Sequence, residues 1–196
     1  MKPSQTLPTD YFDDMYKQHD DPWNFKTSEY EREKYKATIA ALPKAKYENV
    51  FEIGCSIGVL TERLAPKCHS LLSVDVSVIA IEQARKRLSA YPQVRFKKME
   101  IPKEFPEELF DCIIMSEVGY YLSIEDLTIT QQLIVEHLSP GAHLLMVHWT
   151  PIVHDYPLTG DQVHESFLRL SETGKPLKLL FEKREEKYRI NLFEKV

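Results

Sequence analysis

The sequence predicts an α/β protein with a doubly wound, seven-stranded, mostly parallel sheet that ends in an antiparallel hairpin. Between residues 49 and 149, apolar runs alternate with helical patterns, as they do when helices connect parallel strands. The last two apolar runs are separated only by the charged segment 183–187, which is typical of a hairpin. A chain of 196 residues can bury one sizeable core, so we expect a single domain over residues 1–196.

The individual elements follow from periodicity and from capping residues. Ser28 and Glu31 have the S-x-x-E spacing of a capping box, which predicts a helix over residues 28–42. Residues 1–27 are rich in Asp, Tyr and Pro without clean periodicity, so we expect residues 1–42 to form an N-terminal arm and helix that cover the binding site. Strands are predicted over residues 49–53, 71–75, 94–99, 110–115, 143–149, 177–182 and 188–194, and connecting helices from Gly58, Ser77 and Glu125.

Charge and cysteine usage narrow the function classes. The net charge of -5 argues against a nucleic-acid substrate, and the densest basic cluster, residues 85–87, is typical of a solvated helix face. The three cysteines have no C-x-x-C spacing, so free thiols and a cytoplasmic location are expected. The polar residues after Met1 give no apolar leader, and no run is long enough to span a bilayer, so no membrane partner is expected.

A glycine-containing turn at the end of the first strand predicts a cofactor site. Glu52-x-Gly54-x-Ser56-x-Gly58 lies where a strand passes into a helix, so that the backbone and the free N–H groups of the helix can approach a ligand closely. Asp75 ends the next strand, where a carboxylate can accept hydrogen bonds from both ribose hydroxyls. The combination predicts an adenosine-type ligand.

The residues of this turn favour S-adenosylmethionine over NAD. Dinucleotide sites use G-x-G-x-x-G to receive a pyrophosphate, whereas here Ser56 replaces the second glycine. The acidic Glu52 would oppose a pyrophosphate and suit a ligand that carries an ammonium and a sulfonium. We therefore expect S-adenosyl-L-methionine as the cofactor.

In this turn the chain resembles the class I methyltransferases, whose motif has the form acid-x-G-x-G-x-G. This chain departs from the motif only at Ser56. The resemblance implies a Rossmann-like fold and a set of cofactor contacts. It places the methionine part near Glu52, Gly54, Cys55 and Gly58, the ribose near Asp75 and Val76, and the adenine edge near Glu100 and Ile101.

A narrower resemblance covers most of residues 20–145. The chain looks like the nodulation-type (NodS-like) N-methyltransferases in the segments 20–23, 52–55, 64–68 and 117–122. Members of that family methylate the free amine of a glucosamine unit in a deacetylated chitin oligosaccharide, which implies an amine acceptor and, as a finer expectation, an amino sugar. After Trp149 the chain departs from the family pattern, so the resemblance implies reaction and fold rather than substrate.

The segment after the fourth strand is expected to meet the acceptor, because ligands of open α/β sheets bind at the carboxyl ends of the strands. Ser116 is expected to contact the cofactor. Glu117 either removes a proton from the acceptor or only orients it. Tyr120 and Tyr121 are expected to line the substrate pocket, with one of them alternatively in the core. Trp23 either closes over the methionine part or anchors the arm.

Three histidines close the set of candidates. His148, His154 and His164 surround the last parallel strand, and any of them could act as a base near neutral pH, with His154 the best placed. Their wide spacing has no metal-ligand signature, so no metal is expected. The alternatives left open are a small-molecule O-methyltransferase, a non-catalytic domain that binds adenosyl ligands, and an NAD-dependent oxidoreductase.

Overall fold

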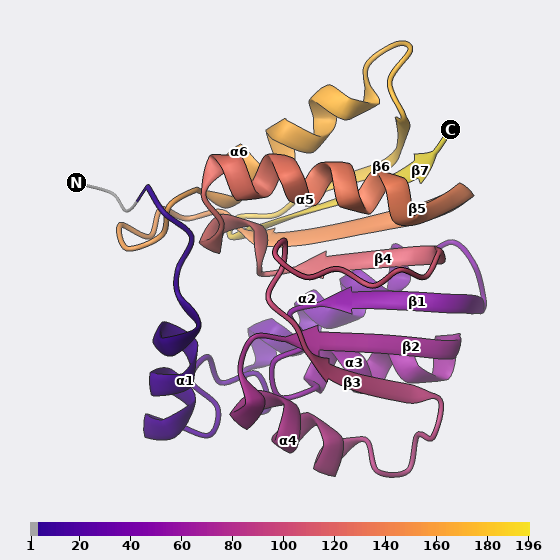
Figure 1. Cartoon of the computed structure of the whole chain (residues 1–196). Helices are drawn as coiled ribbons and strands as arrows, with labels where there is room; N and C mark the ends of the chain where they lie inside the picture. Colours follow the sequence, from indigo (N-terminus) through magenta and orange to yellow (C-terminus); the bar gives the residue numbers. More distant parts are fainter. Residues whose placement is uncertain (1–3) are drawn as a thin grey trace.

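A computed structural model describes residues 4–196, so only the first three residues of the predicted arm lie outside the description. Its centre is one seven-stranded sheet in the order β3-β2-β1-β4-β5-β7-β6, in which β7 is antiparallel to both of its neighbours (Figure 1). The predicted fold class is confirmed. The strands are β1 (Tyr47–Ile53), β2 (Cys68–Asp75), β3 (Val94–Lys98), β4 (Phe110–Ser116), β5 (Leu138–Trp149), β6 (Leu177–Arg184) and β7 (Tyr188–Lys195).

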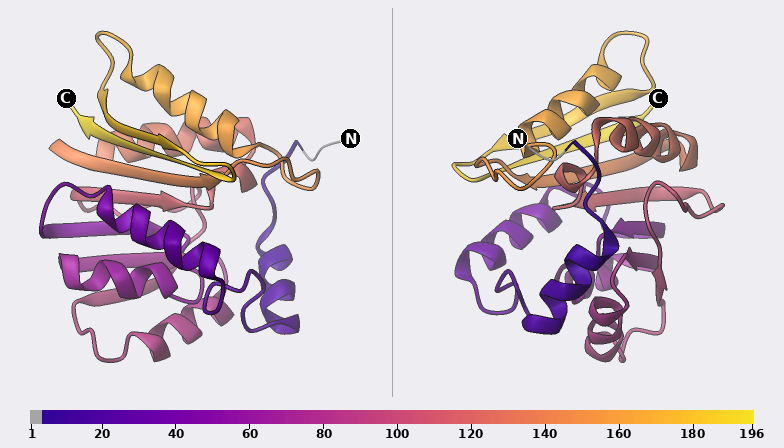
Figure 2. Two further views of the ribbon diagram at one scale, coloured as in Figure 1. Left: turned by 180° about the vertical axis from the view of Figure 1, so that it is seen from behind. Right: turned by 60° about the vertical axis from the view of Figure 1, so that its left-hand side comes forward.

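Helices cover both faces of the sheet (Figure 2). One apolar core joins the sheet to α2 (Glu29–Ala40), α3 (Val59–Leu64) and α4 (Val78–Arg87). The other core joins it to α5 (Ile124–His137) and α6 (Gly160–Leu168). Short 3₁₀ turns follow α3, β4 and α6: η1 (Ala65–Lys67), η2 (Gly119–Tyr121) and η3 (Arg169–Ser171).

The strand order reverses between the parallel neighbours β1 and β4: the strands after β1 are added on one side of the sheet, and those after β4 on the other. At such a switch point the loops that follow neighbouring strands diverge, and a crevice opens at their carboxyl ends. Helix α1 (Thr9–Gln18) stands at this edge, on the side toward which the arrows of the parallel strands point in Figure 1. The topology therefore places the N-terminal segment beside the predicted cofactor loop.

Two helices were not predicted from the sequence. The first, α1, follows Pro8 without any side-chain cap, and so lacks a local start signal. The second, α6, begins with a complete capping box between Thr159 and Gln162, and this T-x-x-Q spacing is a local signal in the sequence.

The capping box predicted for α2 is only half formed. Ser28 accepts a hydrogen bond from the N–H of Glu31, but the Glu31 side chain does not return it. The backbone N–H of Ser28 donates instead to the carbonyl of Asn24, at 2.9 Å. The helix thus begins where expected, while the carboxylate of Glu31 is left available for another role.

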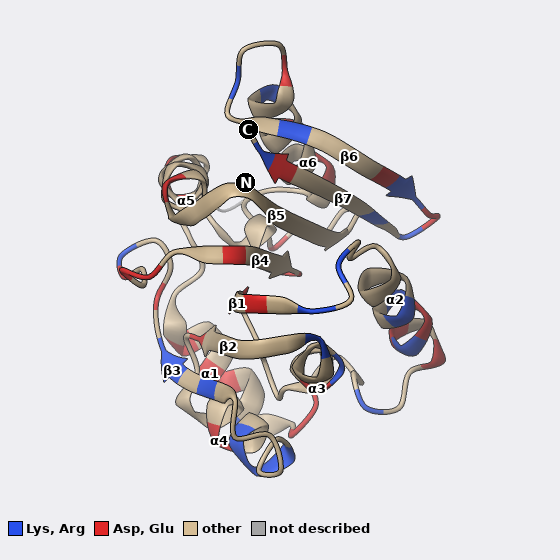
Figure 3. Ribbon diagram, turned by 90° about the vertical axis from the view of Figure 1, so that its right-hand side faces the viewer, with Lys and Arg blue, Asp and Glu red and all other residues tan. Residues whose placement is uncertain are grey.

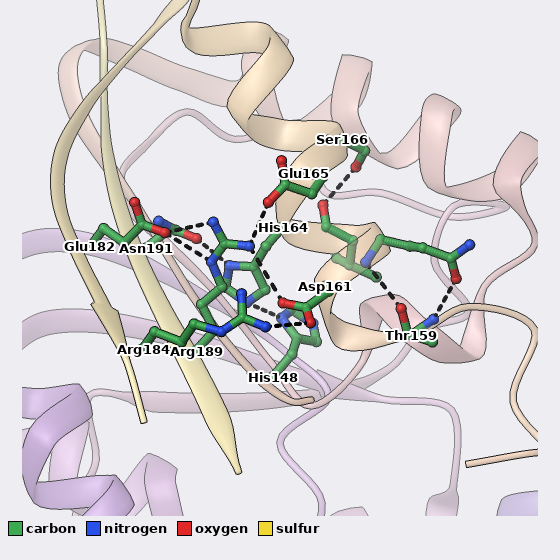
Figure 4. Close-up of polar contacts among 12 residues, drawn as sticks. His148, Thr159, Asp161, His164, Glu165, Ser166, Glu182, Arg184, Arg189 and Asn191 are labelled. Carbon is green, nitrogen blue, oxygen red and sulfur yellow. Dashed lines mark hydrogen bonds and ion pairs between the residues drawn. The ribbon is translucent and has the colours of Figure 1, made fainter. Parts of the chain in front are cut away.

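Ionic contacts attach α6 to the C-terminal hairpin (Figure 4). The guanidinium of Arg189, which is almost fully buried, donates to Glu182 on β6 and to Glu165 on α6. Arg184 donates to Asp161 at the start of the same helix, at 2.7 Å. These contacts hold the region after Trp149, where the family resemblance ends, against the sheet.

Charged residues are interspersed over the elements rather than gathered (Figure 3). Residues 85–87 form the last turn of α4, where Arg85 and Lys86 are exposed as predicted, whereas Arg87 is half-buried and pairs with Glu62. Within residues 4–196, no helix combines the length and the apolar character that a membrane crossing needs.

Candidate active site

A cavity of about 530 Å³ lies at the carboxyl ends of β1, β2 and β4, within the size range of small-molecule sites. Most of the residues predicted to contact the cofactor or the acceptor line this cavity. The lining residues among them are Trp23, Gly54, Cys55, Asp75, Val76, Glu100, Ile101, Ser116, Glu117, Tyr120 and Tyr121. Glu52, Gly58 and His154 are not part of the wall.

Asp75 holds together the loops that follow β1 and β2. One carboxylate oxygen accepts the backbone N–H of Ser56 at 2.8 Å, and the other accepts that of Ser77 at 2.9 Å. Burial raises the pKa of Asp75 to about 6, although these N–H donors oppose the shift. Because a carboxylate offers about four acceptor positions, Asp75 retains capacity for two ligand hydroxyls.

Ser56 occupies a backbone conformation that favours glycine, with a φ of 50°. This explains why the related motif has glycine there. The serine side chain, however, makes a contact that glycine lacks, because its Oγ lies 2.5 Å from the hydroxyl of Tyr16 on α1. A second contact joins Ser77 to Asp13 of the same helix, also at 2.5 Å. The departure from the motif therefore ties the N-terminal helix to the cofactor loop.

Glu52 lies behind the loop and is only 1% exposed. Its Oε2 accepts hydrogen bonds from Thr61 and Ser73, both at 2.7 Å, and burial raises its pKa to about 7. Gly58 also faces away from the cavity and packs on α4, where an added Cβ would meet Leu88 at 2.8 Å. Both residues support the loop in this structure, and their direct contact with a cofactor stays a prediction.

Glu117 is held by three hydrogen bonds at the opposite end of the cavity. Its Oε1 accepts from Nζ of Lys34 at 2.6 Å, while Oε2 accepts from the hydroxyl of Tyr120 at 2.6 Å and from the backbone N–H of Trp149 at 2.8 Å. The residue itself has a left-handed φ of 59°, a strained conformation often found at binding sites. This geometry favours the orienting role over proton removal.

Lys34 connects Glu117 to Glu31, and this group was not predicted. Its ammonium lies 2.9 Å from Oε1 of Glu31, and its side chain is 2% exposed. Burial lowers the pKa of Lys34, but the two carboxylates raise it by more, so the lysine is charged. Burial raises the pKa of Glu31 against the opposing effect of Lys34. In sequence, the two residues have the i,i+3 spacing of an ordinary surface ion pair, so no local signal reveals their burial.

Aromatic rings form much of the remaining wall. Tyr120 stacks on Tyr156 with 5.1 Å between ring centroids, and Tyr121 contacts Phe12 edge to face at 5.0 Å. Tyr120 is 6% exposed, so it belongs to both the core and the cavity wall. Trp23 packs on Tyr16 and also lines the cavity, so both roles considered for it are compatible with its position.

The histidines divide into a buried pair and an exposed residue. His148 accepts the N–H of Gly119 at Nε2, so its proton is on Nδ1, which donates to His164 at 3.1 Å (Figure 4). His164 in turn donates to Asn191. Burial lowers the pKa of both histidines to about 3, so they are neutral, hydrogen-bonded structural residues. His154 is exposed and outside the cavity wall.

No group of three or more His, Cys, Asp or Glu in residues 4–196 is arranged to hold a metal ion. The expected absence of a metal stays a prediction. Cys55, Cys68 and Cys112 are buried free thiols, and burial raises the pKa of each well above its ordinary value.

Comparison with known proteins identifies the family of this chain. The model of the family described as Nodulation protein S (NodS) matches residues 12–148. The chain belongs to the NodS family. Nodulation protein S of Rhizobium tropici is 33% identical over 128 residues, which are 64% of this chain and 54% of that relative. Nodulation protein S of Bradyrhizobium diazoefficiens is 36% identical over 104 residues, or 53% of this chain and 50% of that protein.

Solved structures extend the likeness to the NodS family over nearly the whole chain. The crystal structure of N-methyltransferase NodS from Bradyrhizobium japonicum WM9 in complex with S-adenosyl-L-homocysteine has a TM-score of 0.83 and 25% identity. The match covers 95% of this chain and 98% of that one. The chain nevertheless spans about half the length of the curated NodS relatives that it matches.

Proposed function

We propose that this protein is an S-adenosylmethionine-dependent methyltransferase that methylates the nitrogen of a small amine. The observation that carries the proposal is a single cavity with the ribose-binding type of carboxylate, Asp75, at one end and the Lys34–Glu117 group at the other. Membership of the NodS family and the likeness to an N-methyltransferase of that family support the reaction.

The cofactor fits the first end of the cavity. Asp75 has free acceptor positions for the ribose hydroxyls, and Met99 and Ile101 offer an apolar surface to the adenine. The contacts we propose are those of Trp23, Gly54, Cys55, Asp75, Val76, Glu100, Ile101 and Ser116, with Glu52 and Gly58 supporting the loop. When bound, the cofactor supplies a methyl group on a sulfonium, which is already a good leaving group.

The N-terminal segment is proposed to cover this end of the cavity. Thr6, Phe12 and Tyr16 line the cavity, and α1 is attached to the cofactor loop through Ser56 and Ser77. A cover of this kind excludes water from the reacting atoms and orients them, which is the main contribution a methyltransferase makes to an in-line displacement. We propose residues 1–42 as this cover within a single domain.

An amine acceptor suits the second end better than a hydroxyl does. A hydroxyl is a far weaker acid than an ammonium, so it needs a stronger base than a carboxylate, or a metal ion; both oxygens of Glu117 are engaged and His154 lies outside the cavity. Aromatic rings such as Tyr120 and Tyr156 favour ammonium groups and the C–H faces of sugars. We therefore propose an amino sugar or a similar small amine as acceptor.

A cytoplasmic location is part of the proposal and is supported by the three buried free thiols.

Calorimetric titration tests the proposal. We expect S-adenosylhomocysteine to bind with a Kd on the order of micromolar, Asp75→Ala to lose this binding, and NADH not to bind. Asp14→Ala is the matched control, because Asp14 is an exposed residue of α1. Binding of NADH in place of S-adenosylhomocysteine would end the methyltransferase proposal.

Mass spectrometry of acceptors then separates the remaining alternatives. Incubation with S-adenosylmethionine and D-glucosamine or a deacetylated chitin dimer should yield the N-methylated product. Methylation of a hydroxyl in its place would support an O-methyltransferase. Binding without turnover of any acceptor would support a non-catalytic domain.

A further inference from the structure

Two polar atoms of residues that line the cavity are buried and lack a partner within residues 4–196. They are the hydroxyl of Tyr30 and Oε2 of Glu31, both buried, on consecutive residues of α2. Buried polar atoms are almost always hydrogen-bonded in folded proteins, and an exception on a residue of a cavity wall indicates a position that can bind a ligand. The free atoms therefore mark a polar subsite beside the Lys34–Glu117 group.

The charge of this subsite selects the sign of its ligand. Glu31 and Glu117 share the single ammonium of Lys34, so the group carries one net negative charge. Among the described residues of the wall, Lys34 is the only lysine or arginine. A cationic group is therefore favoured, and Oε2 of Glu31 is the one carboxylate oxygen of this group that no protein donor engages.

The subsite also has an aromatic wall. Tyr30 meets Trp149 edge to face with 5.7 Å between ring centroids, and both line the cavity. Aromatic faces attract ammonium ions, especially where water is excluded. The ammonium of Lys34 already lies 5.4 Å from the centroid of the Tyr30 ring. The same helix turn thus offers a carboxylate oxygen and a hydroxyl to one ligand, with Trp149 as the neighbouring ring.

Resting on the proposed methyltransferase function, we propose that Glu31 binds the ammonium of the acceptor through Oε2 and takes its proton, while the Tyr30 hydroxyl bonds a neighbouring polar group. The acceptor class is then a primary or secondary amine that arrives protonated and carries a hydroxyl or similar group beside the nitrogen. Glu31, and not Glu117, is the catalytic carboxylate.

The proton transfer balances within the site. One N–H bond of the ammonium breaks, an O–H bond forms on Glu31, and the nitrogen keeps the electron pair that it needs as a nucleophile. The proton passes to water when the product leaves. Burial raises the pKa of Glu31 and so favours this transfer, with Glu117 and Asp21 acting in the same direction and Lys34 against it.

The test is a calorimetric titration of amino-sugar probes into the protein saturated with S-adenosylhomocysteine, which measures their affinities. The probes are D-glucosamine, which carries the amine, and N-acetyl-D-glucosamine, which is its neutral counterpart. We expect Glu31→Gln to weaken glucosamine binding by about tenfold or more, because a charge-assisted contact is lost. Binding of the N-acetyl sugar and of S-adenosylhomocysteine should stay within about twofold.

Two further variants serve as a control and as an independent test of the subsite. Glu29→Gln is the matched control, because Glu29 lies on the exposed side of the same helix and pairs with Arg32. Tyr30→Phe removes a hydroxyl that has no protein partner, so it should preserve the fold and weaken glucosamine binding by about threefold to tenfold. The dependence of kcat/KM on pH should lose one ionisation in Glu31→Gln alone.

The outcomes separate the two proposals. Failure of the wild type to bind S-adenosylhomocysteine would defeat the proposed function. If that ligand binds, glucosamine affinities equal to wild type in both Glu31→Gln and Tyr30→Phe would overturn the subsite. Absence of any amine binding by the loaded wild type, tested with glucosamine and methylamine, would overturn it as well.

Discussion

The backbone N–H of Gly119 donates a hydrogen bond to the ring of His148, with 3.0 Å between the two nitrogens. Gly119 begins the η2 turn that presents Tyr120 and Tyr121 to the cavity, and His148 belongs to the neighbouring strand β5. The glycine allows this contact, since an added Cβ would lie 2.6 Å from Val163. The sheet thereby sets the position of the aromatic wall.

Replacement of His148 should therefore destabilise the fold. His148→Ala leaves the N–H of Gly119 and Nε2 of His164 without a partner and opens a cavity, so we expect a loss of about 2 to 5 kcal/mol in the free energy of unfolding. His154→Ala is the matched control and should change it by less than about 0.5 kcal/mol. Urea denaturation measures both. Equal stabilities would show that the buried histidine chain contributes nothing.

Cofactor binding should weaken in acid because Asp75 must be ionised to accept two ribose hydroxyls. Its pKa is raised from 3.8 to about 6, chiefly by burial, with Asp13 adding to the shift. At pH 5 the Kd of S-adenosylhomocysteine should be about tenfold higher than at pH 7.5. Asp75→Asn should bind weakly at both pH values. A pH-independent wild-type affinity would contradict the role of the carboxylate.

Glu52 should reduce stability as the pH rises. Burial raises its pKa from 4.5 to about 7. Between these values the folded protein holds a proton that the unfolded chain releases, so the free energy of unfolding falls as the pH rises and the loss is complete above about 7. Relative to wild type, Glu52→Gln should gain up to about 3 kcal/mol between pH 4.5 and 8. Denaturation at both pH values measures the gain, with the exposed Glu48→Gln on the same strand as control.

The same variant tests the cofactor contact predicted for Glu52 from the sequence. If the residue only supports the loop, Glu52→Gln should bind S-adenosylhomocysteine within about threefold of wild type. A loss of about thirtyfold or more would support a direct contact.

Lys34 should be essential to the fold because its removal leaves two carboxylates facing one another without a counter-charge. Lys34→Met should cost about 3 to 5 kcal/mol of unfolding free energy, and a second change, Glu117→Gln, should recover part of it. Lys36→Met is the control, because Lys36 forms an exposed pair with Glu33 on the same helix and should cost less than about 1 kcal/mol. An additive double variant would show that Lys34 and Glu117 are not coupled.

Most elements whose signals are local were predicted, with α6 as the exception. The alternation of apolar runs located β1, β2 and β4, and Ser28 located the start of α2, because periodicity and capping act over a few residues. The missed α1 had no cap, and it is held by contacts with Ser56 and Ser77, which lie far away in the sequence. Helix α6 was missed although its capping box is local.

The candidate site residues also differ in whether local sequence signals or long-range contacts define them. Gly54 and Asp75 were found because a turn at a strand end and an acid at the end of the next strand have a fixed spacing. The sequence alone does not decide between the two roles of Glu117, since its orientation depends on Lys34 and Trp149, which are distant in sequence.

Local patterns were thus sufficient for the class of fold and the chemical type of the cofactor, because backbone periodicity and loop chemistry are encoded by neighbouring residues. Long-range packing was needed to bury Glu31 and Lys34 in the cavity wall and to keep His148 neutral. Burial and pairing alter the charge and reactivity of a side chain, and both depend on residues that only the folded sheet and its helices bring together.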